Sequence, residues 1–304
     1  MAEGTAWLFP GQGSQSVGMG KALAAARCEA ADVYALADET LGFPVSALCW
    51  EGPTEELTRT ANQQPALVTT SIAMQCVLAA DGRIGTPDFV AGHSLGEYSA
   101  LVAAGSLDLA DALRLVRRRG ELMEEHGLGG MLAIIGLDEE AAQLVANETG
   151  TEVANFNSPG QVTLSGTDEA LQVAEMAVST RGARRVVRLQ VNGAFHSSLM
   201  QPVAEALAPM IEATPIETPI APLVTNVDAE PVDHPDDIRR ELVDQIASSV
   251  KWVRVMEFMA GRGVTQAYEI GPGNVLAGLA RRIDRSLAVD TADQLLAGVE
   301  ASHG

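Results

Sequence analysis

A serine at position 94 lies in a stretch of the sequence that could support nucleophilic catalysis. It stands in the pattern Gly-His-Ser-Leu-Gly at residues 92–96, between a short apolar run at residues 89–91 and a helical pattern over residues 97–104. In such a GxSxG turn the two glycines permit a strained strand-to-helix connection that projects the serine hydroxyl. The next backbone N–H and the helix N-terminus then favour a developing oxyanion. The strand-turn-helix context therefore predicts that Ser94 is a nucleophile.

A serine nucleophile needs a base, and the chain has five histidines. His93 precedes the serine on the strained turn, so we expect its ring to point away from the hydroxyl and to pack or hydrogen-bond beneath the turn. Three others stand in polar, glycine- or proline-flanked or terminal segments, where we expect them to be solvated: His126, His234 and His303. His196 remains, in a loop at residues 192–197, and by position alone its assignment as the base stays open.

A glycine-rich loop, Pro-Gly-Gln-Gly-Ser-Gln at residues 10–15, follows the apolar run at residues 7–9 as a turn follows a buried strand. Its spacing does not fit the common phosphate-binding loops. The next glycine after the loop is Gly18, one residue late for GxGxxG, and Gln15 stands where GxxxxGK ending at Lys21 needs a glycine. We therefore expect a tight loop with exposed backbone N–H groups rather than a nucleotide site.

Composition excludes several classes of function. The net charge of −20 argues against nucleic acid, because phosphates require a basic footprint. No run reaches the roughly 18 apolar residues of a membrane span, and residues 1–10 lack the features of a signal peptide. Three cysteines stand far apart, without a CxxC pattern or a neighbouring histidine pair: Cys28, Cys49 and Cys76. We expect a cytoplasmic protein with no membrane partner, disulfide or metal site.

The order of predicted elements divides the chain. Helical patterns cover residues 20–42 and 64–80, the second opened by Pro65. From Gly130 the elements become shorter and follow the order strand, helix, strand, strand, helix, strand as far as residue 190, which is the ferredoxin-like arrangement. Longer elements then resume. We predict a catalytic core formed by residues 1–128 and 194–304, and an insert at residues 129–193, which places His196 at the return from insert to core.

Four motifs, in order along nearly the whole chain, resemble those of malonyl-CoA:acyl carrier protein transacylases. They are Phe-Pro-Gly-Gln-Gly-Ser-Gln at residues 9–15, Gly-His-Ser-Leu-Gly-Glu-Tyr at 92–98, Asn-Phe-Asn-Ser-Pro-Gly-Gln at 155–161 and Glu-Ile-Gly-Pro-Gly at 269–273. The resemblance implies an α/β fold: an α/β-hydrolase-like core with an inserted ferredoxin-like small subdomain. This agrees with the element order.

The resemblance also implies roles for individual residues. It makes Ser94 the nucleophile and His196 its partner, and it makes the backbone N–H groups of Gln12 and Leu95 the oxyanion hole. In this family a backbone carbonyl, rather than an aspartate, orients the histidine. The matching residue here is Gln245, and the match depends on a short local motif at residues 242–246.

Substrate contacts follow from the same resemblance. Arg119 aligns with the family's substrate-binding arginine, and a planar guanidinium can grip the free carboxylate of a malonyl group with two parallel bonds. The alternative is a solvated basic helix face, which we expect for Arg117 or Arg118. Phe195 resembles the malonyl-selecting form of the motif at residues 193–196, where a bulky ring leaves no room for an α-methyl branch, and Asn157 is a further substrate-binding candidate.

The implied reaction is ping-pong transfer of malonyl from malonyl-CoA to the phosphopantetheine thiol of acyl carrier protein by a monomer that needs no cofactor. Two alternatives stay open. A thioesterase or esterase would share the serine turn, but should need an acid between Ser94 and His196 and should have no use for Arg119. A decayed carrier-binding module would be expected to have lost one of the site residues. Because acyl carrier proteins are acidic, a local basic patch is expected to dock them: Arg181, Arg184, Arg185 and Arg188, unless these only guard a solvated strand edge.

Overall fold

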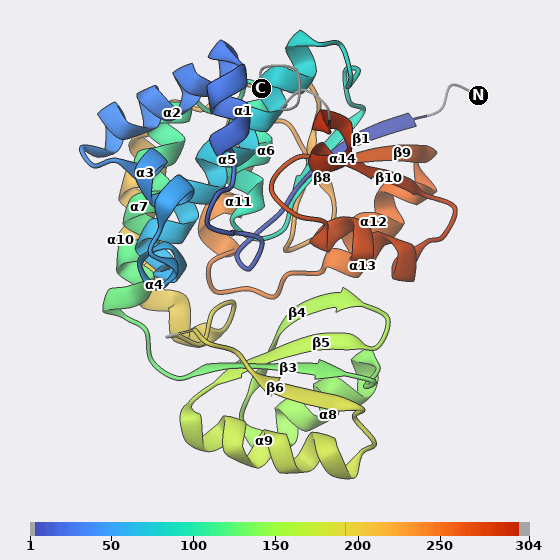
Figure 1. Ribbon diagram of the computed structural model, residues 1–304. Helices are drawn as coiled ribbons and strands as arrows, with labels where there is room; N and C mark the ends of the chain where they lie inside the picture. The colour runs from blue at the N-terminus through green and yellow to red at the C-terminus, as the bar shows by residue number, and fades with distance from the viewer. Residues whose placement is uncertain (1–3, 192, 298–304) are drawn as a thin grey trace.

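Two β-sheets organise the part of the chain that the computed structural model describes, residues 4–191 and 193–297 (Figure 1). The larger sheet has the strand order β10-β9-β1-β2-β7-β8, parallel from β10 to β7, with β8 antiparallel at its edge. Its strands are β1 (Gly4–Phe9), β2 (Phe89–Gly92), β7 (Leu223–Val224), β8 (Pro231–Val232), β9 (Val264–Glu269) and β10 (Ala288–Thr291). The loops that follow β1, β2 and β7 therefore meet at one edge of this sheet.

The side chains of β1 show that the larger sheet is buried on both faces. Trp7 and Phe9 join one apolar cluster, whereas Ala6 and Leu8 join another. Helices cover both faces, as is usual for parallel sheets. The second cluster is formed with α12 (Trp252–Gly261) and α13 (Val275–Ile283). The first is formed with α1 (Lys21–Ala26), α2 (Cys28–Leu41), α3 (Val45–Glu51), α4 (Thr54–Thr58), α5 (Thr60–Ala80), α6 (Gly96–Ala103), α7 (Leu109–Glu125), α10 (Gln201–Ala213), α11 (Pro235–Asp244) and α14 (Ala292–Leu296).

The helical pattern over residues 20–42 corresponds to two helices, α1 and α2. Arg27 separates them, because its backbone is extended (φ −134°, ψ 121°). Its guanidinium pairs with Glu29 at 2.8 Å and with Asp81 at 2.7 Å. These ion pairs connect the start of α2 to the end of α5.

The prediction that Pro65 opens a helix is wrong, because α5 begins at Thr60 and contains Pro65. Proline has no N–H for the carbonyl four residues earlier, which here is that of Ala61. The Arg117 Nη1 donates to this carbonyl at 3.1 Å. A side chain of α7 thus replaces the missing backbone hydrogen bond, which a local pattern cannot show.

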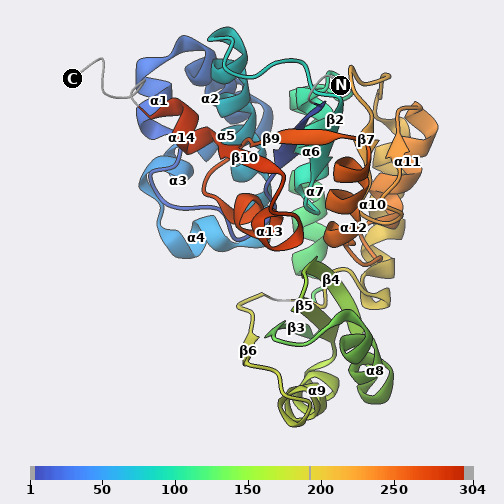
Figure 2. The same cartoon turned by 90° about the vertical axis from the view of Figure 1, so that its right-hand side faces the viewer.

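The smaller sheet is antiparallel, with the order β4-β5-β3-β6. Its strands are β3 (Gly130–Ile135), β4 (Glu152–Ser158), β5 (Gln161–Gly166) and β6 (Arg185–Arg188), and its helices are α8 (Glu139–Thr149) and α9 (Asp168–Thr180). Both helices lie on the side of this sheet away from the larger sheet (Figures 1 and 2). The predicted α/β-hydrolase-like core with a ferredoxin-like subdomain is confirmed.

Strand β4 attaches the small subdomain to the core through backbone hydrogen bonds. Val250 donates to the carbonyl of Ala154 at 2.8 Å and accepts from the N–H of Phe156 at 2.9 Å. The Ser249 hydroxyl also donates to the carbonyl of Val153. The segment before α12 therefore lies beside β4, joined to it by a single parallel bridge between Asn155 and Val250.

Candidate active site

The Gly-His-Ser-Leu-Gly turn connects β2 to α6 through Ser94, whose φ of 51° is rare for a residue with a side chain. Both flanking residues must be glycine, because neither position has room for a Cβ atom. A Cβ on Gly92 would lie 1.8 Å from the carbonyl carbon of Gly96, and a Cβ on Gly96 would lie 2.1 Å from the carbonyl oxygen of Phe9. A conformation of this kind costs about 1–3 kcal/mol, so surrounding contacts must stabilise it.

Asn226, two residues after the end of β7, supplies those contacts. Its Oδ1 accepts from the backbone N–H of Ser94 at 2.7 Å, and its Nδ2 donates to the carbonyl of Gly92 at 2.7 Å. The side chain is fully buried. A single amide therefore holds both sides of the strained turn.

His196 lies against the serine, with its Nε2 2.7 Å from the Ser94 Oγ. Its Nδ1 lies 2.8 Å from the carbonyl of Gln245 and 3.1 Å from that of Ser248. Carbonyls only accept, so Nδ1 carries the proton and Nε2 offers its lone pair to the serine hydroxyl. Burial, with the nearby Arg119 charge, lowers the pKa of His196 to about 3. The imidazole is therefore neutral and able to take a proton.

Arg119, on α7, is fully buried behind the serine. Its Nη2 donates to the Ser94 Oγ at 3.2 Å and to the Gln245 Oε1 at 3.0 Å. Its Nε and Nη1 have no hydrogen-bond partner within the described residues. Buried N–H groups are rarely left without acceptors, so this guanidinium is suited to bind an anionic ligand.

The backbone N–H groups of Gln12 and Leu95 are also unused: neither donates a hydrogen bond to another part of the chain that the structure describes. Leu95 follows the nucleophile directly, and Gln12 lines the same cavity as Ser94. The Gln12 side chain donates to the Gln63 Oε1 at 2.6 Å, which fixes the loop after β1 against α5.

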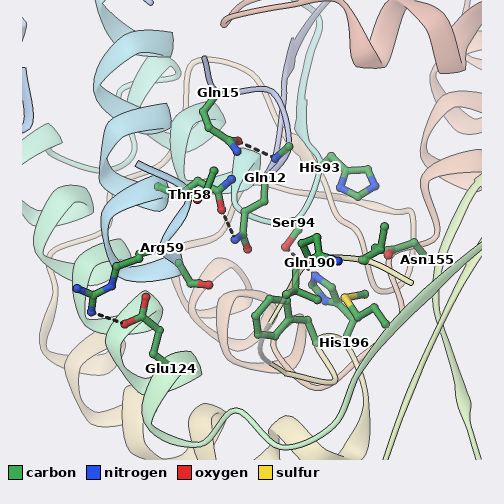
Figure 3. A pocket seen from close by; sticks show the side chains of 17 residues that line it. Gln12, Gln15, Thr58, Arg59, His93, Ser94, Glu124, Asn155, Gln190 and His196 are labelled. Carbon is green, nitrogen blue, oxygen red and sulfur yellow. Dashed lines mark hydrogen bonds and ion pairs between the residues drawn. The ribbon is translucent and has the colours of Figure 1, made fainter. Parts of the chain in front are cut away.

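A cavity of about 700 Å³ opens onto the serine (Figure 3). It lies between the core and the small subdomain, because its walls include Met131 of β3 and Asn155 of β4. Phe195 adds an apolar wall beside His196. Arg59 and Glu124 form an ion pair of 3.1 Å on the opposite wall. A cavity of this volume can hold an acyl group together with part of the longer molecule to which the acyl group is attached.

Four candidates from the sequence are not among the residues that line this cavity: Leu95, Gln245, Arg119 and Asn157. Arg119 reaches the serine from beneath. Asn157 contacts His93, with 2.8 Å between its Oδ1 and the His93 Nε2, whereas its neighbour Asn155 lines the cavity. The His93 ring points away from the Ser94 hydroxyl in Figure 3 and lies 5.5 Å from the Trp252 ring.

Two of the other histidines, His126 and His234, do not line the cavity. His126 and His234 are exposed, and His303 falls outside the described residues. Cys28, Cys49 and Cys76 are free thiols. Within the described residues no cluster of His, Cys, Asp or Glu could hold a metal ion, and no helix there is long and apolar enough to span a membrane.

Sequence reasoning missed four contributors to the site: Glu97, Asn226, Ser248 and Gln63. Glu97 follows the serine motif directly, and Asn226 is a polar residue at the end of a strand, so both carried a local signal. Ser248 contributes only a backbone carbonyl, which any residue type could supply. Gln63 lies in a helix with no distinguishing pattern.

A family described as the acyl transferase domain matches residues 6–269. The chain belongs to this family. It is 45% identical to the malonyl CoA-acyl carrier protein transacylase of Bacillus subtilis, over 93% of this chain and 91% of that protein. It is 43% identical to the protein of that name from Escherichia coli K12, with 95% and 96% covered. A malonyl-transacylase solved in complex with a type II polyketide acyl carrier protein superposes with a TM-score of 0.93, at 41% identity, covering 97% of this chain and 99% of that one.

Proposed function

We propose that this protein transfers a malonyl group from malonyl-CoA to the phosphopantetheine thiol of acyl carrier protein. The observation that carries the proposal is the Ser94–His196 contact of 2.7 Å directly beside Arg119, a buried guanidinium with two donors to spare in the described structure. The first pair suits acyl transfer through a serine ester. The guanidinium suits an acyl group that carries its own carboxylate.

In the first half-reaction His196 takes the proton of the Ser94 hydroxyl, and the oxygen attacks the thioester carbonyl of malonyl-CoA. The N–H groups of Gln12 and Leu95 stabilise the oxyanion, and each such donor is typically worth about 3 kcal/mol. The intermediate collapses, His196 protonates the departing coenzyme A sulfur, and malonyl-serine remains. The carbonyl of Gln245 keeps the imidazole in the required tautomer throughout.

In the second half-reaction the carrier's thiol enters the same cavity. His196 takes the thiol proton, the sulfur attacks the ester, and the proton passes to the Ser94 oxygen as malonyl leaves on the carrier. Proton and acyl group therefore balance over the cycle, and no cofactor is required. One base serves both steps.

Arg119 binds the malonyl carboxylate in this mechanism with guanidinium N–H groups that have no partner in the described structure. Phe195 limits the space beside the α-carbon. Asn157 acts through His93, whose ring it holds. The oriented histidine argues against a hydrolase of the usual triad type, because two carbonyls occupy Nδ1 where an acid would be expected.

We also infer that the catalytic core comprises residues 1–128 and 194–304, with residues 129–193 as the insert, and that the protein works as a cytoplasmic monomer.

The test is intact-protein mass spectrometry after incubation with malonyl-CoA. We expect a single malonyl adduct that disappears when acyl carrier protein is added and that persists in water. Ser94→Ala should show no adduct. An adduct of full mass on that variant would refute the assignment of the nucleophile.

A further inference from the structure

A buried carboxylate that the mechanism above does not use lies behind the nucleophile. Glu97, in the first turn of α6, is fully buried and does not line the cavity. Its Oε1 accepts from the backbone N–H of Asn226 at 2.7 Å, and its Oε2 accepts from the Gln245 Nε2 at 2.6 Å. Each oxygen thus holds one residue of the site.

Donors and acceptors in this network can be assigned without seeing hydrogens. Arginine only donates, so the Gln245 amide must turn its oxygen toward Arg119 and its NH₂ group toward Glu97. The Asn226 backbone N–H also only donates. Both oxygens of Glu97 therefore act as acceptors, which is the pattern of an ionised carboxylate.

The same network also stabilises the positive charge of Arg119, which forms no salt bridge with a carboxylate in the described part of the chain. The Gln245 amide stands between Arg119 and Glu97, with its oxygen toward the cation and its NH₂ toward the anion. Glu97 thereby offsets the buried positive charge while leaving Nε and Nη1 of Arg119 unoccupied within the described residues. A carboxylate in direct contact with the guanidinium would compete with the substrate.

We propose that ionised Glu97 is a positioning residue for malonyl transfer: it holds the Gln245 amide in the orientation that keeps Arg119 charged, aimed at Ser94 and free to bind the malonyl carboxylate. This inference rests on the proposed function. Glu97 also supports the turn through Asn226, whose side chain holds Ser94. It touches neither substrate nor reacting atoms.

Charged and titratable groups face Glu97 from two other helices, Arg119 from α7 and Glu241 from α11, and Tyr98 adjoins it on α6. Burial raises the pKa of Glu97 to about 8, and Glu241 adds to the rise, while the Asn226 N–H, Arg119 and Gln245 act against it. The ionised form is therefore lost as pH falls through this value. Malonyl loading should weaken over the same range, and acetyl loading much less.

The decisive comparison uses Glu97→Gln and the double variant Glu97→Gln/Gln245→Glu. In the single variant the one amide oxygen at position 97 can accept from either the Asn226 N–H or the Gln245 NH₂, but not from both. The new NH₂ group then faces the other donor in either orientation. Losing a charged hydrogen bond in a buried site predicts a fall of about 10- to 100-fold in kcat/KM for malonyl loading. Loading from acetyl-CoA should fall clearly less, since acetyl has no carboxylate for Arg119.

The double variant restores the donors and acceptors that link position 97 to Asn226 and position 245 to Arg119, with the same net charge as the wild type, but position 245 no longer donates to the Ser94 carbonyl. The new amide at position 97 accepts from Asn226 and donates to the new carboxylate at position 245, which in turn accepts from Arg119. We expect malonyl loading about tenfold above that of the single variant. Recovery should be incomplete, because the relocated carboxylate would touch Arg119 directly. A side chain that merely fills space would give no such recovery.

The pH profile gives an independent readout. The acid limb of malonyl loading near pH 8 should be present in the wild type, absent in Glu97→Gln, and displaced to lower pH in the double variant, where the carboxylate adjoins Arg119. The control Glu241→Gln should keep the limb and move it slightly to lower pH, because one repelling carboxylate is gone.

Three results would overturn the proposal: an unchanged ratio of malonyl to acetyl loading in Glu97→Gln, a double variant no better than the single one, or a wild-type malonyl profile without the acid limb. The last needs no variant and stays decisive even if Glu97→Gln fails to fold, which thermal unfolding would reveal. A wild type that never acquires a malonyl adduct would instead refute the proposed function.

Discussion

Removing the Arg119 guanidinium should separate malonyl from acetyl transfer. The side chain is fully buried, and its Nε and Nη1 have no partner in the described structure, so in the proposed mechanism the guanidinium has N–H groups free for the substrate carboxylate. In Arg119→Ala that carboxylate would enter a closed site without an opposite charge. Truncating one member of a buried, hydrogen-bonded charge pair costs about 2–4 kcal/mol, which corresponds to roughly 30- to 1,000-fold in kcat/KM.

The assay is the rate of Ser94 acylation from malonyl-CoA and from acetyl-CoA, followed by rapid quenching and intact mass. Acetyl loading should lose far less, because no carboxylate is left unpaired. Arg118→Ala is a matched control on the same helix: this neighbour is part-exposed and pairs with Glu121 and Glu125 rather than with the site. It should leave both rates close to wild type.

Equal losses for the two substrates in Arg119→Ala would refute the reasoning. Arg119 would then act on the shape of the site through its bonds to Ser94 and Gln245, and the malonyl carboxylate would have another partner. A defect in Arg118→Ala as large as that in Arg119→Ala would point to the outer face of α7 instead.

The other predictions concern the base and the carrier. His196→Ala should abolish both loading from malonyl-CoA and transfer to the carrier, since one base serves both; normal transfer would refute the assignment of His196 as the base. Because burial lowers the pKa of His196 to about 3, it stays neutral above that pH, and neither half-reaction should show a limb near the ordinary histidine value of about 6.5. Arg184 and Arg185 are exposed and form no ion pairs within the described residues. Charge reversal at both positions should raise KM for the carrier and remove the salt dependence of that KM, while malonyl loading stays near normal. An unchanged carrier KM at low salt would move docking elsewhere, to Lys251 and Arg254.

Local signals predicted the serine turn and the insert because each is encoded within a few residues. The glycines of the turn exclude any larger side chain, and the short alternating elements after Gly130 have a recognisable order. Elements that depend on packing were missed. β10 and α14 follow a weak pattern near the end of the chain, and the start of α5 depends on Arg117 contacting the Ala61 carbonyl.

In the site, too, local motifs predicted some residues, whereas contacts that depend on packing were missed. The serine motif and the resemblance predicted Ser94 and His196, and the structure places them in contact. The network behind them could not be predicted, because Glu97, Asn226 and Gln245 come from segments far apart in sequence and meet only when β2, β7 and α11 are packed. A sequence motif identifies a residue, but only the fold shows what it touches.

Backbone hydrogen bonds between β4 and Val250 connect the ferredoxin-like insert to the segment that orients His196. The same short segment presents the Gln245 and Ser248 carbonyls to His196 and, two residues later, pairs with β4 through the backbone of Val250. The insert is therefore not an interchangeable module. An engineer who grafts the ferredoxin-like unit of a relative onto this core, to change carrier preference, must also transplant or match residues 245–250, or the chimera will load its serine poorly even from malonyl-CoA.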